Sequence, residues 1–420
     1  MEKFVVKGGA CLEGTVSISG AKNAAVAILP AAIVSDGPCV LQNVPKIGDV
    51  EIITRIMTQI GVKVSFAADN TLEIDSSAIE THVVPQDLSR HMRASYYFLG
   101  ALLSKFNKSV VSLPGGCNLG ARPIDQHLKA FSALGCDVSV EYGMIKVACR
   151  NGLRGTHVFF DTVSVGATIN SILAAVKAEG RTVLENVAKE PHIVDLANFL
   201  NSMGADIRGA GTDVIKINGV SYLRGTTYTI IPDQIEAGTY MAAAAATGGD
   251  VVITNVIPKH LESISSRLKR IGAEVIEYDE SVRVRRSGPV ISTNIRTMPH
   301  PGFPTDMQPQ FAVLLSLSDG TSIITESIWD NRFKYVDELR RMGVRISVTD
   351  KVAVVEGIRK INGARVKATD LRAGAALIIA GLVAEGETTV EDIYHIDRGY
   401  EDIATKLGNL GADIKRVDIE

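Results

Sequence analysis

The chain has 420 residues, of which 46% are hydrophobic and 22% are charged, and its formal net charge is −3. This length exceeds what one hydrophobic core usually serves, so we expect two or more domains. The small net charge excludes a global attraction to nucleic acid or anionic lipid, so any anion-binding site must be local.

The cysteines and the apolar segments indicate the compartment. Five cysteines occur without a paired framework or CxxC spacing, which argues against structural disulfides and zinc. The N-terminus has no signal-peptide pattern, and the longest apolar runs, 24–34 and 373–384, are shorter than a membrane span. We therefore expect a soluble protein of the reducing cytoplasm, without membrane or nucleic-acid partners.

One motif recurs six times along the chain: a helix that ends in a hydrophobic residue and a glycine, followed by a strand. The glycines are Gly61, Gly135, Gly204, Gly272, Gly343 and Gly411, spaced by 74, 69, 68, 71 and 68 residues. Such regular spacing indicates an internal repeat. Each glycine fits the left-handed position that ends a helix.

Each copy has the same elements upstream of its glycine. A short strand, such as 15–19, leads into a helix that is apolar on almost all sides and is therefore expected to be buried. These helices are 24–34, 94–104, 168–177, 237–247, 307–317 and 373–383. A second strand and an amphipathic helix follow, and two strands close the copy, as in 62–66 with 71–75. The predicted unit is β-α-β-α-β-β.

Six units predict an α/β (α+β) protein with two lobes of three units each, because three buried helices can pack together behind their sheets. The boundary is expected within 219–232. We assign 22–230 to the first lobe, and 1–21 with 231–420 to the second.

Polar and charged residues stand where the buried helices begin. They include Lys22, Asn23, Arg93, Ser164, Thr305, Asp306, Asp370 and Arg372. Ligands in α/β proteins gather where strand ends meet helix N-termini, which carry unpaired N–H groups. Two lobes that face each other across such ends would form a cleft.

The segment 113–128 connects a predicted strand to a helix and contains Cys117, Arg122 and Asp125 among three glycines. An arginine can hold a phosphate or carboxylate in a fork, and positive surroundings lower the pKa of a thiol. The segment is therefore a candidate reactive loop. The alternative is an ordinary glycine-rich connection with a buried free cysteine.

Seven motifs along the chain are similar to those of one enzyme family. They lie at 20–23, 92–95, 114–125, 303–306, 331–333, 370–374 and 397–400. With them the whole chain resembles the UDP-N-acetylglucosamine 1-carboxyvinyltransferases, members of the enolpyruvyl transferases. The shikimate-pathway members share the six-unit architecture but have a different lysine loop and lack a loop of the Cys117 type.

The resemblance implies a fold and a reaction. Each lobe would be an inside-out α/β barrel of three β-α-β-α-β-β repeats. The 3-hydroxyl of UDP-N-acetylglucosamine would add to C2 of phosphoenolpyruvate while C3 is protonated. Phosphate would then leave, giving the enolpyruvyl ether that commits the sugar to peptidoglycan. No cofactor and no metal are implied.

The resemblance also implies a role for each site residue. The catalytic residues would be Cys117, Asp306, Lys22, Arg398 and Asp370, with Asp306 as the base for the sugar hydroxyl and Cys117 as the acid. The substrate contacts would be Lys22, Asn23, Arg93, Arg122, Pro123, Ile124, Asp125, Gln126, Ser164, Val165, Gly166, Asp306, Ile328, Arg332, Arg372 and Arg398. Several arginines suit the phosphate, carboxylate and diphosphate groups of the two substrates.

Some of these residues have simpler interpretations. Asp306 and Asp370 each follow a threonine at a helix start and could be helix caps, and Asn23 could occupy a turn or an N-cap. His127 suggests a Cys–His hydrolase pair with Cys117, but a histidine at a helix start is more often structural. Thr162 and Gln126 depart from the family, since some members have lysine and leucine there.

Two other functions remain to be separated from the main hypothesis. One is a catalytically silent sensor of nucleotide sugar, which the presence of Cys117, Asp306 and Arg398 argues against. The other is a transferase that uses shikimate 3-phosphate as acceptor, which the lysine loop disfavours.

Overall fold

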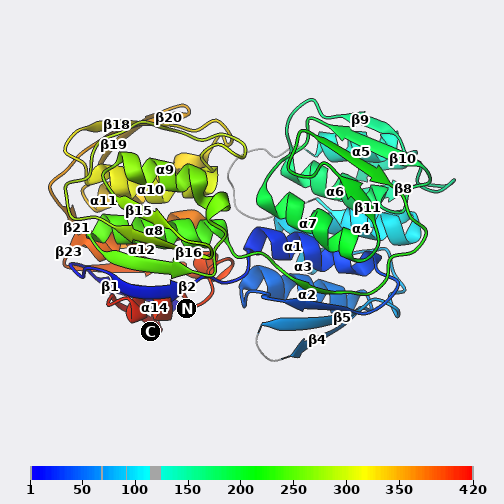
Figure 1. Ribbon diagram of the computed structural model, residues 1–420, viewed down its shortest axis with the longest axis horizontal. Coiled ribbons are helices and arrows are strands. Elements are labelled where there is room, and N and C mark those ends of the chain that lie inside the picture. The colour runs from blue at the N-terminus through cyan, green and yellow to red at the C-terminus, as the bar shows by residue number, and fades with distance from the viewer. Residues whose placement is uncertain (1, 68–69, 91, 114–123, 419–420) are drawn as a thin grey trace. The chain divides into compact units, whose positions relative to one another are not determined.

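The computed structural model describes residues 2–67, 70–90, 92–113 and 124–418. Two compact units divide the chain (Figure 1). Unit 1 contains the described residues of 1–19 and 232–420, and unit 2 contains those of 20–231. The units are described one at a time below.

The sheets of unit 2 share one pattern, in which a parallel pair is extended by antiparallel strands. The first sheet has the order β13 (Thr227–Thr229), β3 (Cys39–Gln42), β5 (Thr71–Asp75) and β4 (Lys63–Ala67). The second has the order β6 (Lys108–Ser112), β8 (Met144–Ala148) and β7 (Asp137–Glu141), with a parallel bridge from Val83 to Val110 at its edge. The third has the order β9 (His157–Phe159), β10 (Arg181–Glu185), β12 (Val214–Asn218) and β11 (Asp206–Arg208).

Unit 1 repeats this pattern in three four-stranded sheets. The first has the order β2 (Glu13–Ser17), β14 (Asp250–Thr254), β16 (Ser281–Arg285) and β15 (Glu274–Glu277). The second has the order β17 (Ile295–Arg296), β18 (Thr321–Thr325), β20 (Val352–Glu356) and β19 (Arg345–Thr349). The third has the order β22 (Arg365–Lys367), β24 (Glu387–Glu391), β1 (Glu2–Lys7) and β25 (Asp413–Asp418). A small sheet pairs β21 (Ile361–Asn362) with β23 (Ala384–Glu385).

Two kinds of helix accompany these sheets. The apolar helices are almost completely buried, as expected for segments without a polar face. They are α1 (Lys22–Ala31), α4 (Tyr97–Phe106) and α6 (Val165–Ala175) in unit 2, and α8 (Gln234–Thr247), α10 (Gln308–Ser316) and α12 (Leu371–Val383) in unit 1. The partly exposed helices are α2 (Gly48–Gln59), α5 (Asp125–Ala133), α7 (Pro191–Ser202), α9 (Glu262–Arg270), α11 (Val336–Arg341) and α14 (Ile403–Asn409). Each unit has its own hydrophobic core around its buried helices.

The six repeat glycines all have positive φ. The values are 95° for Gly61, 92° for Gly135, 107° for Gly204, 93° for Gly272, 89° for Gly343 and 96° for Gly411. A side chain is strained in this region of backbone conformation, so glycine is favoured. The predicted left-handed helix endings are confirmed.

The N-terminal strands belong to unit 1, although the helix that follows them belongs to unit 2. Strand β1 lies between β24 and β25 and pairs antiparallel with both. Strand β2 pairs parallel with β14. The predicted strand 15–19 therefore does not join the sheet of the first buried helix, and β13 takes the parallel place beside β3.

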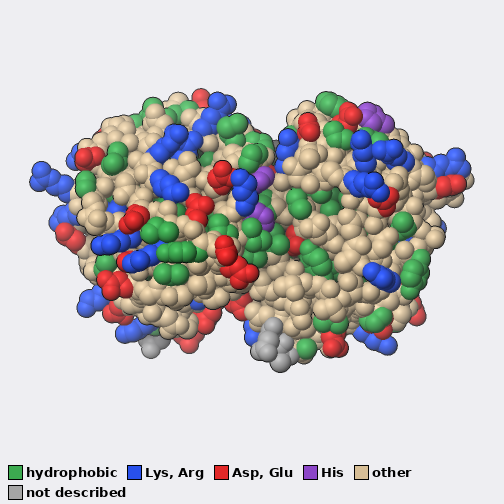
Figure 2. Space-filling view, viewed as in Figure 1, with side chains coloured by type: hydrophobic (Ala, Val, Ile, Leu, Met, Phe, Trp, Pro, Cys, Tyr) green, Lys and Arg blue, Asp and Glu red, His purple; other side chains and the backbone are tan. Residues whose placement is uncertain are grey.

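The surface carries charges of both signs. Figure 2 shows basic and acidic side chains interspersed on the face of each unit in view. Within the described parts of the chain, every helix is too short or too polar to cross a membrane.

A buried carboxylate holds the segment at which the chain leaves unit 2. Asp195, on α7, accepts a hydrogen bond from the Tyr228 hydroxyl at 2.6 Å and one from the Ile231 N–H at 3.3 Å. Burial raises the pKa of Asp195 to about 6, although both hydrogen bonds act in the opposite direction. The folded protein therefore keeps this proton at pH values where the unfolded chain has lost it.

This raised pKa gives a stability prediction for the variant Asp195→Asn. The ordinary aspartate value is 3.8, so the proton stabilises the wild-type fold at low pH, and that stabilisation is lost as the pH rises to about 6. The loss should be on the order of 3 kcal/mol between about pH 4 and pH 6, and the variant should lack it. Urea unfolding at several pH values measures the difference. If the free energy of unfolding changes with pH equally in the wild-type protein and in Asp195→Asn, the prediction is contradicted.

Candidate active site

In unit 1, Asp306 lies between two buried guanidinium groups. Asp306 belongs to a short 3-10 segment, Thr305–Met307, immediately before α10. Its Oδ1 lies 3.2 Å from Nη2 of Arg332, and its Oδ2 lies 3.2 Å from Nε and 3.1 Å from Nη2 of Arg372. The arginine side chains are 2% and 3% exposed, whereas the Asp306 side chain is 29% exposed. Two fixed cations thus orient a carboxylate that still reaches solvent.

The helix-cap interpretation is wrong for Asp306 and right for Asp370. The residue that caps α10 is Met307, and no side chain makes a capping bond there. Asp370 caps α12, because its Oδ1 accepts hydrogen bonds from the N–H groups of Arg372 and Ala373 at 2.9 and 3.0 Å. The same Oδ1 lies 4.0 Å from Nη1 of Arg332. Asp370 therefore fixes the start of the helix that carries Arg372.

Arg372 packs on Tyr400, which belongs to a buried network of polar side chains. Its guanidinium lies over the ring of Tyr400, 5.3 Å from the ring centre. The Tyr400 hydroxyl lies 2.8 Å from the Thr239 hydroxyl on α8, and the Gln310 amide on α10 donates to both. Burial alone lowers the pKa of Arg372, but the nearby Tyr400 and Asp306 raise it above its ordinary value. The guanidinium therefore stays charged.

The remaining predicted site residues of unit 1 are Arg398 and Ile328. Arg398 follows the short helix Tyr394–Asp397 and is half-buried, two residues before Tyr400. After burial, Arg398 is the largest influence that lowers the pKa of His395. Ile328 is half-buried in the loop after β18, and its N–H donates to Glu326.

In unit 2, Lys22 and Asn23 are the first two residues of α1. The Lys22 ammonium lies 3.0 Å from Oδ2 of Asp49, a buried residue in the first turn of α2. The residue that caps α1 is Ala21, so Asn23 is not an N-cap. Sequence reasoning missed Asp49, although an acidic residue in the first turn of an amphipathic helix was a visible signal.

Arg93 begins the 3-10 segment Arg93–Tyr96, and its guanidinium lies 5.6 Å from the centre of the Tyr96 ring. The rings of Tyr96 and His127 form an edge-to-face pair, and His127 Nδ1 lies 3.0 Å from the Asn170 amide nitrogen. Burial, with a smaller contribution from Arg93, lowers the pKa of His127 to about 3. A neutral, buried imidazole that is held by Asn170 supports the structural interpretation of His127 over the hydrolase pair.

Ser164, Val165 and Gly166 form the N-terminus of α6. Ser164 is the N-cap and accepts a hydrogen bond from the Ala167 N–H at 3.3 Å. Gly166 is tightly enclosed, because a Cβ there would lie 2.6 Å from the Tyr96 hydroxyl and 2.9 Å from Cε1 of His127. This arrangement brings the Arg93 and Ser164 segments together and leaves a helix N-terminus of the kind that binds anions.

The side chain of Gln126 forms hydrogen bonds with other residues of unit 2. Its amide nitrogen donates to Asp125 at 2.8 Å and to Asp161 at 3.2 Å, and its carbonyl accepts the Asp161 N–H at 3.0 Å. Lys129 also bonds the Asp161 carboxylate, at 2.8 Å. Thr162 is exposed. Ile124 is the residue that precedes α5.

Three predicted residues, Cys117, Arg122 and Pro123, lie outside the described residues. Of the described cysteines, Cys11 is exposed, and Cys39, Cys136 and Cys149 are buried, all as free thiols. Where the chain is described, it holds no cluster of three or more His, Cys, Asp or Glu residues that could bind a metal.

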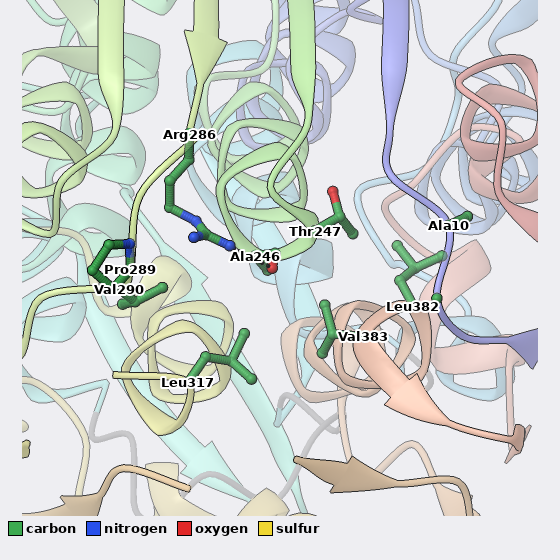
Figure 3. Close-up of a pocket in the computed structure, with 10 residues that line it drawn as sticks. Ala10, Ala246, Thr247, Arg286, Pro289, Val290, Leu317, Leu382 and Val383 are labelled. Atoms are coloured by element: carbon green, nitrogen blue, oxygen red, sulfur yellow. Dashed lines mark hydrogen bonds between the residues drawn. The ribbon is translucent and has the colours of Figure 1, made fainter. Parts of the chain in front are cut away.

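A cavity of about 330 Å³ in unit 1 is lined by other residues (Figure 3). It lies where α8, α10 and α12 end, between Thr247, Leu317 and Val383. Arg286 reaches toward the end of α8 and bonds the carbonyl oxygen of Ala246 at 3.2 Å. None of the described site residues lines this cavity, which is therefore not part of the candidate site.

The packing around Gly166 gives a testable prediction. Gly166→Ala should destabilise the fold by about 1 to 3 kcal/mol, because the new methyl group overlaps Tyr96 and His127. Adding Tyr96→Phe removes the closest atom, so the double variant should recover part of the loss. Gly408→Ala, where nothing lies within 4 Å, is the matched control. Thermal unfolding measures all three, and an equal loss at positions 166 and 408 would contradict the interpretation.

Comparison with known proteins identifies relatives along the whole chain. The family model of EPSP synthase (3-phosphoshikimate 1-carboxyvinyltransferase) matches residues 6–407. UDP-N-acetylglucosamine 1-carboxyvinyltransferase 3 of Caldanaerobacter subterraneus is 59% identical over 417 residues, covering 99% of this chain and 100% of the relative. UDP-N-acetylglucosamine 1-carboxyvinyltransferase of Clostridium botulinum is 56% identical over 419 residues, with the same two coverages.

Solved structures agree with the predicted mixed α/β class. The enolpyruvyl transferase NikO from Streptomyces tendae has a TM-score of 0.90 at 27% identity, covering 100% of this chain and 99% of that one. An EPSP synthase from Acinetobacter baumannii, at 17% identity and a TM-score of 0.78 with both chains fully covered, shares the fold. The chain therefore belongs to the UDP-N-acetylglucosamine 1-carboxyvinyltransferases, a branch of the enolpyruvyl transferase family.

Proposed function

We propose that this protein transfers the enolpyruvyl group of phosphoenolpyruvate to the 3-hydroxyl of UDP-N-acetylglucosamine and releases phosphate, in the first committed step of peptidoglycan synthesis. The observation that carries the proposal is full-length identity of 59% and 56% to two relatives named for this activity. The Asp306 site in unit 1 offers residues suited to it.

The reaction needs a base, an acid and cations. The sugar oxygen forms a bond to C2 of phosphoenolpyruvate while C3 gains a proton. The C2–O bond to phosphate then breaks, and C3 loses a proton to restore the double bond. Asp306 would take the sugar hydroxyl proton, for which a partly exposed carboxylate held by Arg332 and Arg372 is suited. Cys117 would give the proton to C3.

The buried arginines have donors left for an anion. Within the described residues, Nε of Arg332 and Nη1 of Arg372 have no hydrogen-bond partner, although both atoms are buried. An unpartnered buried donor is costly, and a charged oxygen of a substrate would remove that cost. We assign Arg332 and Arg372, with Arg93, to the substrate anions. Lys22, Arg122 and Arg398 are assigned to the phosphate of phosphoenolpyruvate.

The nucleotide sugar takes the remaining residues. Asn23 and Ile328 are assigned to the sugar, and Ser164, Val165 and Gly166 to the diphosphate at the start of α6. Pro123, Ile124, Asp125 and Gln126 are assigned to the uracil. Both N–H groups of the Gln126 amide are engaged with Asp125 and Asp161, and its carbonyl oxygen accepts the Asp161 N–H. Gln126 can therefore serve the uracil only through the second lone pair of that oxygen.

The proposal includes the finer architecture. Each unit would be an inside-out α/β barrel, with its three buried helices inside and its three sheets around them. The lobes would be 22–230 and 1–21 with 231–420. The protein would act in the cytoplasm, where both substrates are soluble, without a cofactor.

The direct test is phosphate release from phosphoenolpyruvate. Release should require UDP-N-acetylglucosamine and should not occur with shikimate 3-phosphate in its place. Binding of the nucleotide sugar without any turnover would identify a silent sensor and overturn the proposal. Turnover with shikimate 3-phosphate would reassign the acceptor.

Asp306→Asn tests the base. Loss of a general base should lower kcat by about 100-fold to 10,000-fold, while UDP-N-acetylglucosamine still binds, because the side chain keeps its shape. Steady-state kinetics and titration calorimetry measure the two effects. Asp337→Asn, at an exposed carboxylate paired with Arg340 in the same unit, should have wild-type kcat. A normal kcat in Asp306→Asn would exclude Asp306 as the base.

Cys117→Asp tests the acid. A carboxylic acid can give the proton to C3 but attacks an epoxide poorly, so the variant should keep activity and resist an epoxide phosphonate. Its pH optimum should move toward acid. Cys11→Ala, which removes an exposed thiol, should leave the inactivation unchanged. An adduct mapped by mass spectrometry to a cysteine other than Cys117 would contradict the assignment.

A further inference from the structure

Glu326 is a buried carboxylate that none of the proposed substrate contacts includes. It follows β18, is 1% exposed, and accepts four hydrogen bonds within unit 1. A carboxylate is rarely buried so deeply without a specific task, because desolvation of its charge must be offset by its partners. The partners of Glu326 fall into two groups.

The first group leads to Asp306. Oε2 of Glu326 accepts the Thr305 hydroxyl at 3.0 Å. The carbonyl oxygen of the same Thr305 accepts a hydrogen bond from Nη2 of Arg332 at 3.1 Å, and that Nη2 also contacts Asp306. The residue before Asp306 is therefore held through its side chain and its backbone. Since Asp306 has its own ion pairs, the whole turn at 305–306 is fixed.

The second group leads to Ile328. Oε1 of Glu326 accepts the N–H groups of Ile328 at 2.8 Å and Trp329 at 3.1 Å, and also the Thr297 hydroxyl at 2.9 Å. The Thr297 oxygen in turn accepts the Ser327 N–H at 2.8 Å. Three consecutive N–H groups of the loop after β18 thus end on Glu326 or on Thr297.

We propose that Glu326 is a positioning residue that sets Asp306 through Thr305 and sets Ile328 through the loop backbone. This inference rests on the proposed function, in which Asp306 is the base and Ile328 borders the sugar. One carboxylate then couples the placement of the base to the placement of the sugar whose proton the base removes. Small displacements of a reacting group lower rates steeply. Loss of the contacts on the Asp306 side and loss of the contacts on the Ile328 side should therefore change the kinetic constants in different ways.

Replacing Glu326 itself, as in Glu326→Met, removes the acceptor of four donors, among them the buried Thr297 hydroxyl, and endangers folding. Two threonine variants separate the two sides instead. Thr305→Val keeps the shape of the side chain and removes the hydroxyl that reaches Glu326, whereas Thr305→Ser keeps that hydroxyl. Thr297→Val removes the hydroxyl on the loop side.

Thr305→Val should lower kcat by about 10-fold to 100-fold with little change in the KM for UDP-N-acetylglucosamine, and Thr305→Ser should recover most of the loss. Thr297→Val should mainly raise the KM for UDP-N-acetylglucosamine. A wild-type kcat in Thr305→Val overturns the proposal. The proposal is also overturned if kcat falls equally in both valine variants and in proportion to their loss of thermal stability. That result would mean that the hydrogen bonds of Glu326 only stabilise the fold.

Amide hydrogen exchange tests the same inference without turnover. Exchange in peptides that cover 304–308 should rise in Thr305→Val and stay normal in Thr305→Ser, and exchange at 326–329 should rise in Thr297→Val. Unchanged exchange in both valine variants overturns the positioning role. A wild-type protein that turns over neither substrate, combined with these exchange changes, overturns the proposed function and leaves the positional coupling supported.

Discussion

Two arginines buried in one unit require carboxylates, and unit 1 is arranged around that requirement. An unpaired buried guanidinium costs several kcal/mol, so Arg332 and Arg372 depend on Asp306, which contacts both. Asp370, which lies near Arg332, caps the helix that carries Arg372. The Tyr400 ring and the Thr305 carbonyl complete the surroundings of the two cations. The ion pairs therefore determine where α10 and α12 begin relative to each other.

The repeated architecture could be predicted because it depends on local patterns. The amino-acid sequence shows six helices without a polar face and six glycines at helix ends, and the structure has both. The partners of β1, β2 and β13 could not be predicted in this way. The sequence of a strand shows which of its faces is buried, but it does not show which distant strand it pairs with. Hydrogen bonds between strands that lie far apart in the chain leave no local signal.

The candidate site was predictable where a residue type has one chemical use, and less so where it has several. Arginines at helix starts indicated anion binding, whereas the ion pairs of Arg332 and Arg372 with Asp306 were not predicted. An aspartate after a threonine is ambiguous, because Asp370 caps its helix and Asp306 does not. Asp49 was missed because its partner, Lys22, lies in another helix. Glu326 was missed because two of its partners, the hydroxyl groups of Thr297 and Thr305, come from other segments that only the folded chain brings to it.

The place of β1 has a consequence for the order in which the protein is made. Chains fold from the N-terminus during synthesis, and 20–231 provides every strand of the unit 2 sheets in one continuous segment. Strand β1 is synthesised before unit 2 and has to wait for β24 and β25, which follow unit 2 in the chain. During that interval it is an unpaired edge with an apolar centre, Phe4 to Val6. The charged Glu2, Lys3 and Lys7 on either side of that centre protect the waiting strand from pairing with other nascent chains.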